Sequence, residues 1–187
     1  MSRPLKVVAL SGGTWRPSRT LVLTQALLAE LAGHLSIESH LIELGDIARP
    51  LGGALSRQEL SAEVEAELRA IEQADLLIVA APVYRGSYPG LLKHLFDLID
   101  LNALIDTPVL LAATGGSERH ALVLDHQLRP LLSFFQAVTL PIGVYATEAD
   151  FVDYQITSEP LKARIRLAAE RAAPLFATQI KPLLKIA

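Results

Sequence analysis

The chemistry of this chain concentrates in three short segments, and the first is crowded with hydroxyl and guanidinium groups. Residues 11–20, SGGTWRPSRT, stand directly before an expected helix. The start of a helix offers unpaired backbone N–H groups and the positive end of a dipole, which attract anions. The side-chain donors that a phosphate monoester needs are Ser11, Arg16, Ser18, Arg19 and Thr20. The loop predicts a phosphate site, although a capped turn with solvent-facing arginines uses the same residue types.

The other two segments suit a flat, polar-edged ring. Residues 81–90, APVYRGSYPG, place tyrosines and prolines between a buried strand and a helix. Tyr84 is expected to contact a ring there, although tyrosines that merely close the core fit the pattern equally well. The third segment is Thr114-Gly115-Gly116-Ser117, whose glycines let the backbone approach a ligand and present N–H groups to carbonyl oxygens.

Alternating strands and helices are needed to position these segments. Apolar runs predict strands over residues 5–10, 37–44, 76–81, 108–113 and 138–146. Helical spacing of apolar residues predicts helices from Ser18 to about Gly33 and over residues 60–74, 90–101, about 120–136 and about 158 onward. Glycine and proline over residues 45–53 predict a longer surface loop.

This order predicts an α/β fold: a flavodoxin-like three-layer sandwich with a five-stranded parallel sheet in the order 2-1-3-4-5. A length of 187 residues fits a single domain covering the whole chain. In such a sheet, ligands bind beyond the carboxyl ends of the strands. The three segments follow neighbouring strands, so we expect them to meet in one site.

Composition excludes several function classes. The net charge of −3 argues against a nucleic-acid partner, and the absence of cysteine excludes disulfides and thiolate metal sites. The five histidines show no metal-ligand spacing, so no metal is expected. Residues 11–20 lack the P-loop lysine and the full G-x-G-x-x-G pattern. No signal peptide or membrane span is visible, which favours a cytoplasmic protein.

Taken together, the three segments resemble those of the NAD(P)H-dependent FMN reductase family. The resemblance is greatest to the reductase components of two-component alkanesulfonate and methanesulfonate monooxygenases, and it covers nearly the whole chain. It implies that Ser11, Arg16, Ser18, Arg19 and Thr20 hold the FMN phosphate. It also implies that Pro82, Val83, Tyr84 and Arg85 flank the flavin ring, and that Thr114, Gly115, Gly116 and Ser117 lie at its pyrimidine edge.

The resemblance also implies what the enzyme does. Hydride would pass from NAD(P)H to FMN, and reduced FMN would leave for a partner monooxygenase that removes sulfite from sulfonates in sulfur assimilation. The family forms homodimers and homotetramers through helices near the flavin. Because the cofactors carry the chemistry, we assign no residue a strict catalytic role. An FMN-retaining quinone or azo reductase and a flavodoxin-like electron carrier remain as alternatives, since both share the fold and flavin loops.

One further feature lies in the expected helix over residues 120–136. Pro130 cannot donate a backbone hydrogen bond to the carbonyl of His126, four positions earlier. We therefore expect a kink or a widened π-type turn near His126. Related reductases resemble this arrangement, with an inserted residue at the subunit interface that is linked to flavin release. A simple proline kink without function explains the sequence equally well.

Overall fold

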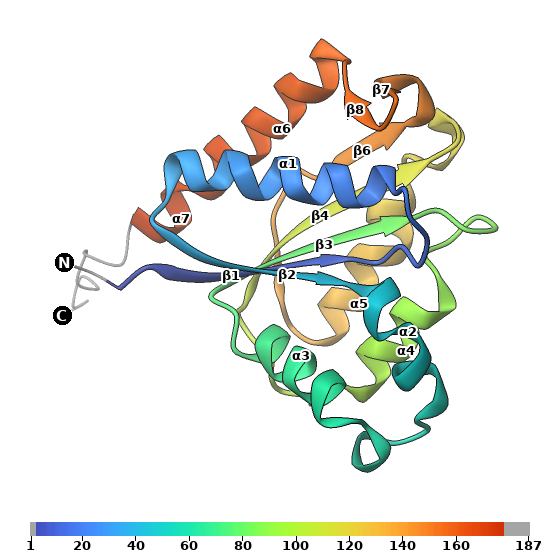
Figure 1. Cartoon of the computed structure of the whole chain (residues 1–187). Coiled ribbons are helices and arrows are strands. Elements are labelled where there is room, and N and C mark those ends of the chain that lie inside the picture. Colours follow the sequence, from blue (N-terminus) through green and yellow to red (C-terminus); the bar gives the residue numbers. More distant parts are fainter. Residues whose placement is uncertain (1–2, 178–187) are drawn as a thin grey trace, which may run out of the picture.

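A computed structural model describes residues 3–177, in which a parallel sheet lies between two layers of helices (Figure 1). The strands run in the order β2-β1-β3-β4-β5, with β6 also paired to β4, so the expected flavodoxin-like order is confirmed. Their bounds are β1 (Leu5–Ser11), β2 (Ile37–Glu43), β3 (Leu76–Pro82), β4 (Pro108–Gly115), β5 (Val138–Thr139) and β6 (Val144–Thr147).

Helices cover both faces of the sheet and bury a separate core against each face (Figure 1). One face carries α1 (Arg19–His34), α6 (Glu159–Ala172) and the short α7 (Pro174–Ala177). The other carries α2 (Leu44–Gly53), α3 (Ala62–Glu72), α4 (Gly90–Leu98) and α5 (Arg129–Phe134). All seven residues of β3 are buried, as expected for a central parallel strand covered on both sides.

The register of the sheet aligns the ends of its strands. Ser11 at the end of β1 lies opposite Ala80 of β3. Pro82 at the end of β3 lies opposite Thr114 of β4, and Gly115 lies opposite Thr147 of β6. Because parallel strands end at the same edge, the loops that follow β1, β3, β4 and β6 come together there.

The prediction of a surface loop over residues 45–53 is wrong, because this segment forms the helix α2. Its apolar residues Leu44, Ile47 and Leu51 recur at helical spacing and are buried. Pro50 stands near the end of the helix, and α2 packs against α4, so burial of one face outweighs the weak helical propensity of proline and glycine.

The strand expected over residues 138–146 is divided into β5 and β6, both paired with β4. Pro141 lies between the two segments, and its missing N–H prevents a continuous ladder. After β6 come a short turn, η4 (Glu148–Asp150), and an antiparallel hairpin of β7 (Phe151–Val152) and β8 (Gln155–Ile156). The sequence did not predict this hairpin. The closing helix begins where the sequence predicts, because Ser158 caps α6. Ser18 likewise caps α1, as expected.

A π-type turn occupies the segment around His126, as expected from Pro130. The segment begins with a short 3-10 turn, η2 (Glu118–His120). It continues as η3 (Leu124–Leu128), a π-helix that leads into α5. The N–H of Arg129 bonds to the carbonyl of Leu124, five residues earlier. This widened turn precedes Pro130 directly, so the lost proline donor is accommodated without breaking the helical segment.

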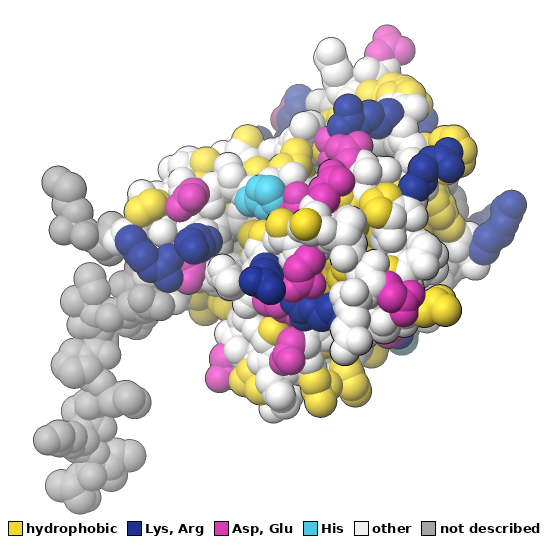
Figure 2. Space-filling model, turned by 60° about the horizontal axis from the view of Figure 1, so that its bottom comes forward, with side chains coloured by type: hydrophobic (Ala, Val, Ile, Leu, Met, Phe, Trp, Pro, Cys, Tyr) yellow, Lys and Arg dark blue, Asp and Glu magenta, His cyan; other side chains and the backbone are white. Residues whose placement is uncertain are grey.

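Figure 2, in which the lower part of Figure 1 is turned toward the viewer, shows charged groups of both signs across that face. Arg57, in the short turn η1 (Arg57–Glu59), pairs with both Glu65 and Glu72 of α3. Hydrogen bonds from Arg57 and Arg69 lower the pKa of Glu65 to about 2. Within residues 3–177, none of the helices is long and apolar enough to cross a membrane.

Candidate functional site

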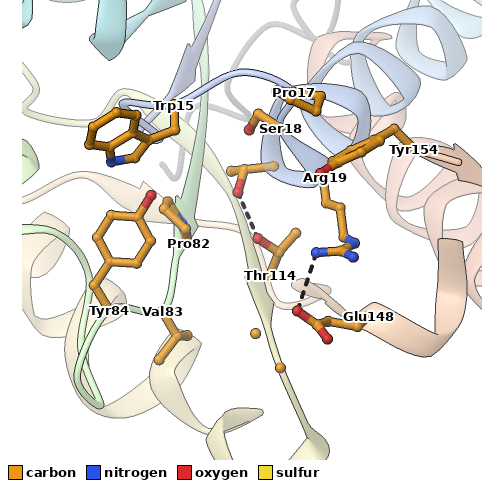
Figure 3. Close-up of a pocket in the computed structure, with 13 residues that line it drawn as sticks. Trp15, Pro17, Ser18, Arg19, Pro82, Val83, Tyr84, Thr114, Glu148 and Tyr154 are labelled. Carbon is orange, nitrogen blue, oxygen red and sulfur yellow. Dashed lines mark hydrogen bonds and ion pairs between the residues drawn. The ribbon is translucent and has the colours of Figure 1, made fainter.

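A pocket opens at the carboxyl edge of the sheet, where the loops after β1, β3, β4 and β6 meet (Figure 3). Nine of the residues predicted from the sequence line this pocket: Ser18, Arg19, Thr20, Pro82, Val83, Tyr84, Thr114, Gly115 and Gly116. The structure therefore brings together residues from all three predicted segments.

The remaining predicted residues lie elsewhere. Ser11 and Arg16 line a smaller neighbouring cavity that shares Trp15 and Ser18 with the main pocket. Arg85 stands at the exposed tip of the loop after β3, and Ser117 lies beyond the lining of both cavities. The residues of the predicted phosphate loop are thus divided between two adjoining cavities.

The start of α1 forms the end of the pocket that carries donor groups. The Ser18 hydroxyl accepts a hydrogen bond of 3.1 Å from the N–H of Leu21 and so caps the helix. Its own proton is left for another acceptor. Arg19, the first residue of α1, extends its guanidinium toward the pocket (Figure 3). No acidic residue stands in the first turn of α1, so the positive end of the dipole is not offset from within the helix.

A buried hydroxyl pair joins α1 to β4 at the floor of the pocket. The side-chain oxygens of Thr20 and Thr114 lie 2.6 Å apart, and both residues are buried. One hydroxyl donates to the other, which leaves the second proton available to a ligand or to solvent. The pair links the first turn of α1 to the end of β4.

Aromatic and apolar groups form the opposite wall. Trp15 and Tyr84 face each other across the mouth of the pocket (Figure 3), with 77% and 41% of their surface exposed. The loop of Tyr84 is fixed by a tight turn, in which the N–H of Tyr84 donates to the Ser87 carbonyl at 2.7 Å. Gly86 adopts a φ of 86° in this turn. The exposed aromatic faces leave room for a flat ring.

Tyr145 holds the glycine loop after β4 in place. Its hydroxyl donates to the Ser117 carbonyl at 2.6 Å. Burial raises the pKa of the Tyr145 hydroxyl, so the donor proton is kept at neutral pH. A Cβ on Gly115 would lie 2.1 Å from the Tyr145 oxygen, whereas a Cβ on Gly116 would meet nothing within 4 Å. Gly115 is therefore required for close approach of Tyr145, and Gly116 leaves the backbone open toward the pocket.

Sequence reasoning missed four pocket residues. Trp15 and Pro17 lie within the predicted phosphate loop, whereas Glu148 and Tyr154 follow β6. The rule that ligands bind beyond the ends of parallel strands points to the segment after the fifth strand as well. Applying it there would have indicated Glu148. Tyr154 lies in the β7–β8 hairpin, for which the sequence carries no turn signal of the Asn-Gly kind.

Comparison with known proteins finds similarity to FMN reductases in each case. The family model described as NADPH-dependent FMN reductase matches residues 5–151. The chain is 94% identical over 187 residues, the full length of both chains, to the "NADH-dependent FMN reductase SfnF" of Pseudomonas fluorescens (strain Pf0-1). It is 76% identical, again over the full length of both chains, to the "FMN reductase (NADPH)" of Pseudomonas aeruginosa (strain PAO1). A solved structure titled NADH:FMN oxidoreductase (EMOB), apo form, superimposes with a TM-score of 0.81 at 28% identity, covering 95% of this chain and 92% of that one.

Proposed function

The chain belongs to the NADPH-dependent FMN reductase family, and we propose that it transfers hydride from NADH or NADPH to FMN held in the pocket at the carboxyl edge of the sheet. It is an oxidoreductase that uses FMN and a nicotinamide donor.

The chemistry of the residues that line the pocket supports FMN as its ligand. One end combines a helix start with the guanidinium of Arg19, which suits a phosphate dianion. The other end has the flat faces of Trp15 and Tyr84, which suit an aromatic ring. Gly116 also lines the pocket, and a Cβ there would meet nothing within 4 Å, so a ligand is able to approach the backbone at this position.

When bound, FMN supplies the atom that accepts hydride, so the chain needs no acid or base of its own for that step. We assign the phosphate to Arg19, Ser18 and the first N–H groups of α1. Tyr84 and the apolar Val83 support the ring and keep water from one of its faces. The backbone of Gly115 and Gly116 faces the polar edge of the ring and orients it for the nicotinamide.

The observation that carries this proposal is the meeting of Arg19 at a helix start with the aromatic wall across one pocket (Figure 3). It is tested by following NADH and NADPH oxidation at 340 nm while FMN is varied. Arg19→Ala should raise the KM for FMN about tenfold or more, the typical effect of losing a charge-assisted hydrogen bond. The same variant should leave the KM for riboflavin, which has no phosphate, unchanged.

Arg166→Ala is the matched control, because Arg166 is exposed on α6 and lies outside the pocket lining. Its KM for FMN should equal that of the wild-type enzyme. A normal KM for FMN in Arg19→Ala would refute the assignment of the phosphate to Arg19. An equal rise for FMN and riboflavin would place Arg19 at the ring or the ribityl chain instead.

We further propose that reduced FMN leaves this enzyme and is used by a flavin-dependent monooxygenase acting on sulfonates, in the cytoplasm where NADH and NADPH are available. The open mouth of the pocket, with Trp15 and Tyr84 exposed, supports exchange of the flavin. The purified protein should be largely colourless and should depend on added FMN for turnover. A yellow protein that turns over quinones rapidly without added FMN would instead indicate a quinone or azo reductase.

We also propose that the chain forms a homodimer or homotetramer through an apolar groove between α4 and the η3–α5 segment. The groove has a volume of about 650 Å³, and Phe134 and Leu101 stand at it with 66% and 56% of their surface exposed. Exposed apolar surface of this kind marks an interaction site. Phe134→Glu should shift the molar mass measured by light scattering to that of one chain, and an unchanged mass would refute this interface.

A further inference from the structure

The guanidinium of Arg19 is already engaged by a carboxylate at the pocket. Its Nη1 lies 3.2 Å from Oε1 of Glu148, and the ring of Tyr154 lies beneath it at 5.3 Å from the ring centroid (Figure 3). Both partners come from the segment after β6 and line the same pocket. An anion that binds Arg19 must therefore share it with Glu148 or displace it.

Glu148 is held in this position by the local structure. It opens the turn η4, which is closed by a reciprocal capping box between Thr147 and Asp150. The Asp150 carboxylate accepts from the Thr147 N–H at 2.7 Å and from the Thr147 hydroxyl at 3.0 Å. Thr147 is in turn paired in register with Gly115 of β4. The backbone that carries Glu148 is thus held against β4 at the edge of the pocket.

Tyr154 is presented to Arg19 by a strained turn. Asp153 and Tyr154 connect β7 to β8 with φ values of 47° and 60°. The left-handed region is unfavourable for residues other than glycine, and especially for a bulky tyrosine. Such strain persists where the surrounding structure enforces it, often at functional sites. Here the strained turn places an aromatic face against the guanidinium and so limits its movement.

The second arginine of the phosphate loop is paired in the same way. Arg16 bonds to Glu43 through two nitrogens, at 2.8 and 2.5 Å, and lies 3.6 Å from Asp46. The hydrogen bond with Glu43 raises the pKa of Arg16. Both guanidinium groups of residues 11–20 are therefore matched by carboxylates from other elements.

We propose that Glu148 competes with the FMN phosphate for Arg19 and thereby keeps the flavin exchangeable. This inference rests on the proposed function, in which Arg19 binds that phosphate. A phosphate monoester carries between one and two negative charges at neutral pH, so it is repelled by an ionised carboxylate on the same guanidinium. The side chains of Arg19 and Glu148 are 37% and 61% exposed, so solvent screens the effect and a several-fold change in affinity is expected.

The test measures FMN and riboflavin binding to the full chain by quenching of flavin fluorescence. Glu148→Gln keeps the shape of the side chain and removes its charge. Its Kd for FMN should fall by about two- to fivefold relative to the wild-type protein, while its Kd for riboflavin stays the same. Glu170→Gln is the matched control, since Glu170 is exposed in the last turns of α6 and outside the pocket. It removes an equal charge and should leave both Kd values unchanged.

The same substitution in the Arg19→Ala background completes the test. There, Glu148→Gln should lower the Kd for FMN by a smaller factor than in the wild-type background, because the shared cation is gone and only direct repulsion by the carboxylate is left. An unchanged or higher Kd for FMN in Glu148→Gln alone would overturn the inference, as would an equal fall for riboflavin. These outcomes differ from failure of the proposed function, in which the wild-type protein itself binds no FMN or Arg19→Ala binds it normally.

Discussion

Gly115 is the position at which the structure predicts the largest effect of adding one carbon atom. Gly115 lies outside the left-handed region of φ, so alanine is compatible with its backbone. The added Cβ would nevertheless lie 2.1 Å from the Tyr145 hydroxyl oxygen and 3.1 Å from Cζ of that ring, where ordinary contact begins at 3.4 Å. Either the ring or the loop must therefore move by more than 1 Å.

The size of the effect of Gly115→Ala follows from two contributions. Overpacking of a close contact costs about 1–3 kcal/mol. Displacement of Tyr145 also breaks its hydrogen bond to the Ser117 carbonyl, which contributes about 0.5–1.5 kcal/mol. A loss of about 2–4 kcal/mol should lower the Tm by roughly 5–10 °C in a chain of this length. The KM for FMN should rise about tenfold, because the loop that faces the ring moves with its N–H groups.

Gly116→Ala is the matched control for this prediction. A Cβ at that position meets nothing within 4 Å, so its free energy of unfolding should stay within about 1 kcal/mol of the wild-type value. Adding Tyr145→Phe to Gly115→Ala removes the oxygen at 2.1 Å and should recover part of the lost stability. Thermal unfolding followed by circular dichroism measures all of these variants. Equal Tm values for Gly115→Ala and Gly116→Ala would refute the reasoning.

Two further predictions concern buried and paired polar groups. Thr114→Val leaves the buried hydroxyl of Thr20 without its partner at 2.6 Å, so urea unfolding should show a loss of about 1–3 kcal/mol. The double variant Thr20→Val/Thr114→Val should recover part of this loss. An unchanged free energy of unfolding in Thr114→Val would contradict a stabilising hydrogen bond between the two hydroxyls. The pKa of Glu65 is lowered to about 2 by Arg57 and Arg69, so its contribution to stability is present above about pH 5 and fades as the pH falls toward 2. The free-energy difference between the wild-type protein and Glu65→Gln should therefore shrink over that range in urea titrations, and a constant difference would argue against the ion pair.

The parallel sheet was predictable because buried strands carry strong local signals. The residues of β3 are apolar along their whole length, and only a strand covered on both faces shows that pattern. The helix α2 was not predictable in the same way, because Gly45, Pro50 and the final glycines disfavour helix locally. The helix is stabilised instead by packing of Ile47 and Leu51 into the core. That packing depends on α4, which lies far along the chain.

The widened turn before Pro130 was predictable for the opposite reason. A missing backbone donor has a local consequence, and the structure meets it with the bond from Arg129 to Leu124. The β7–β8 hairpin gave no such signal, since Asp153 and Tyr154 adopt φ values that their residue types disfavour. Contacts with the surrounding structure stabilise this turn, so the local sequence does not predict it.

The phosphate loop shows how far local reasoning about charge extends. Donors such as Arg16 and Arg19 are recognised from residue type and from their place before a helix. Their acceptors are not local, since Glu43 follows Arg16 by 27 positions and Glu148 follows Arg19 by 129. A count of donors in the loop predicts tight phosphate binding, whereas the fold brings a carboxylate to each guanidinium. If residues 11–20 bind the flavin phosphate as proposed, the strength of that binding depends on Glu43 at the end of β2 and Glu148 after β6, neither of which is visible in the loop sequence.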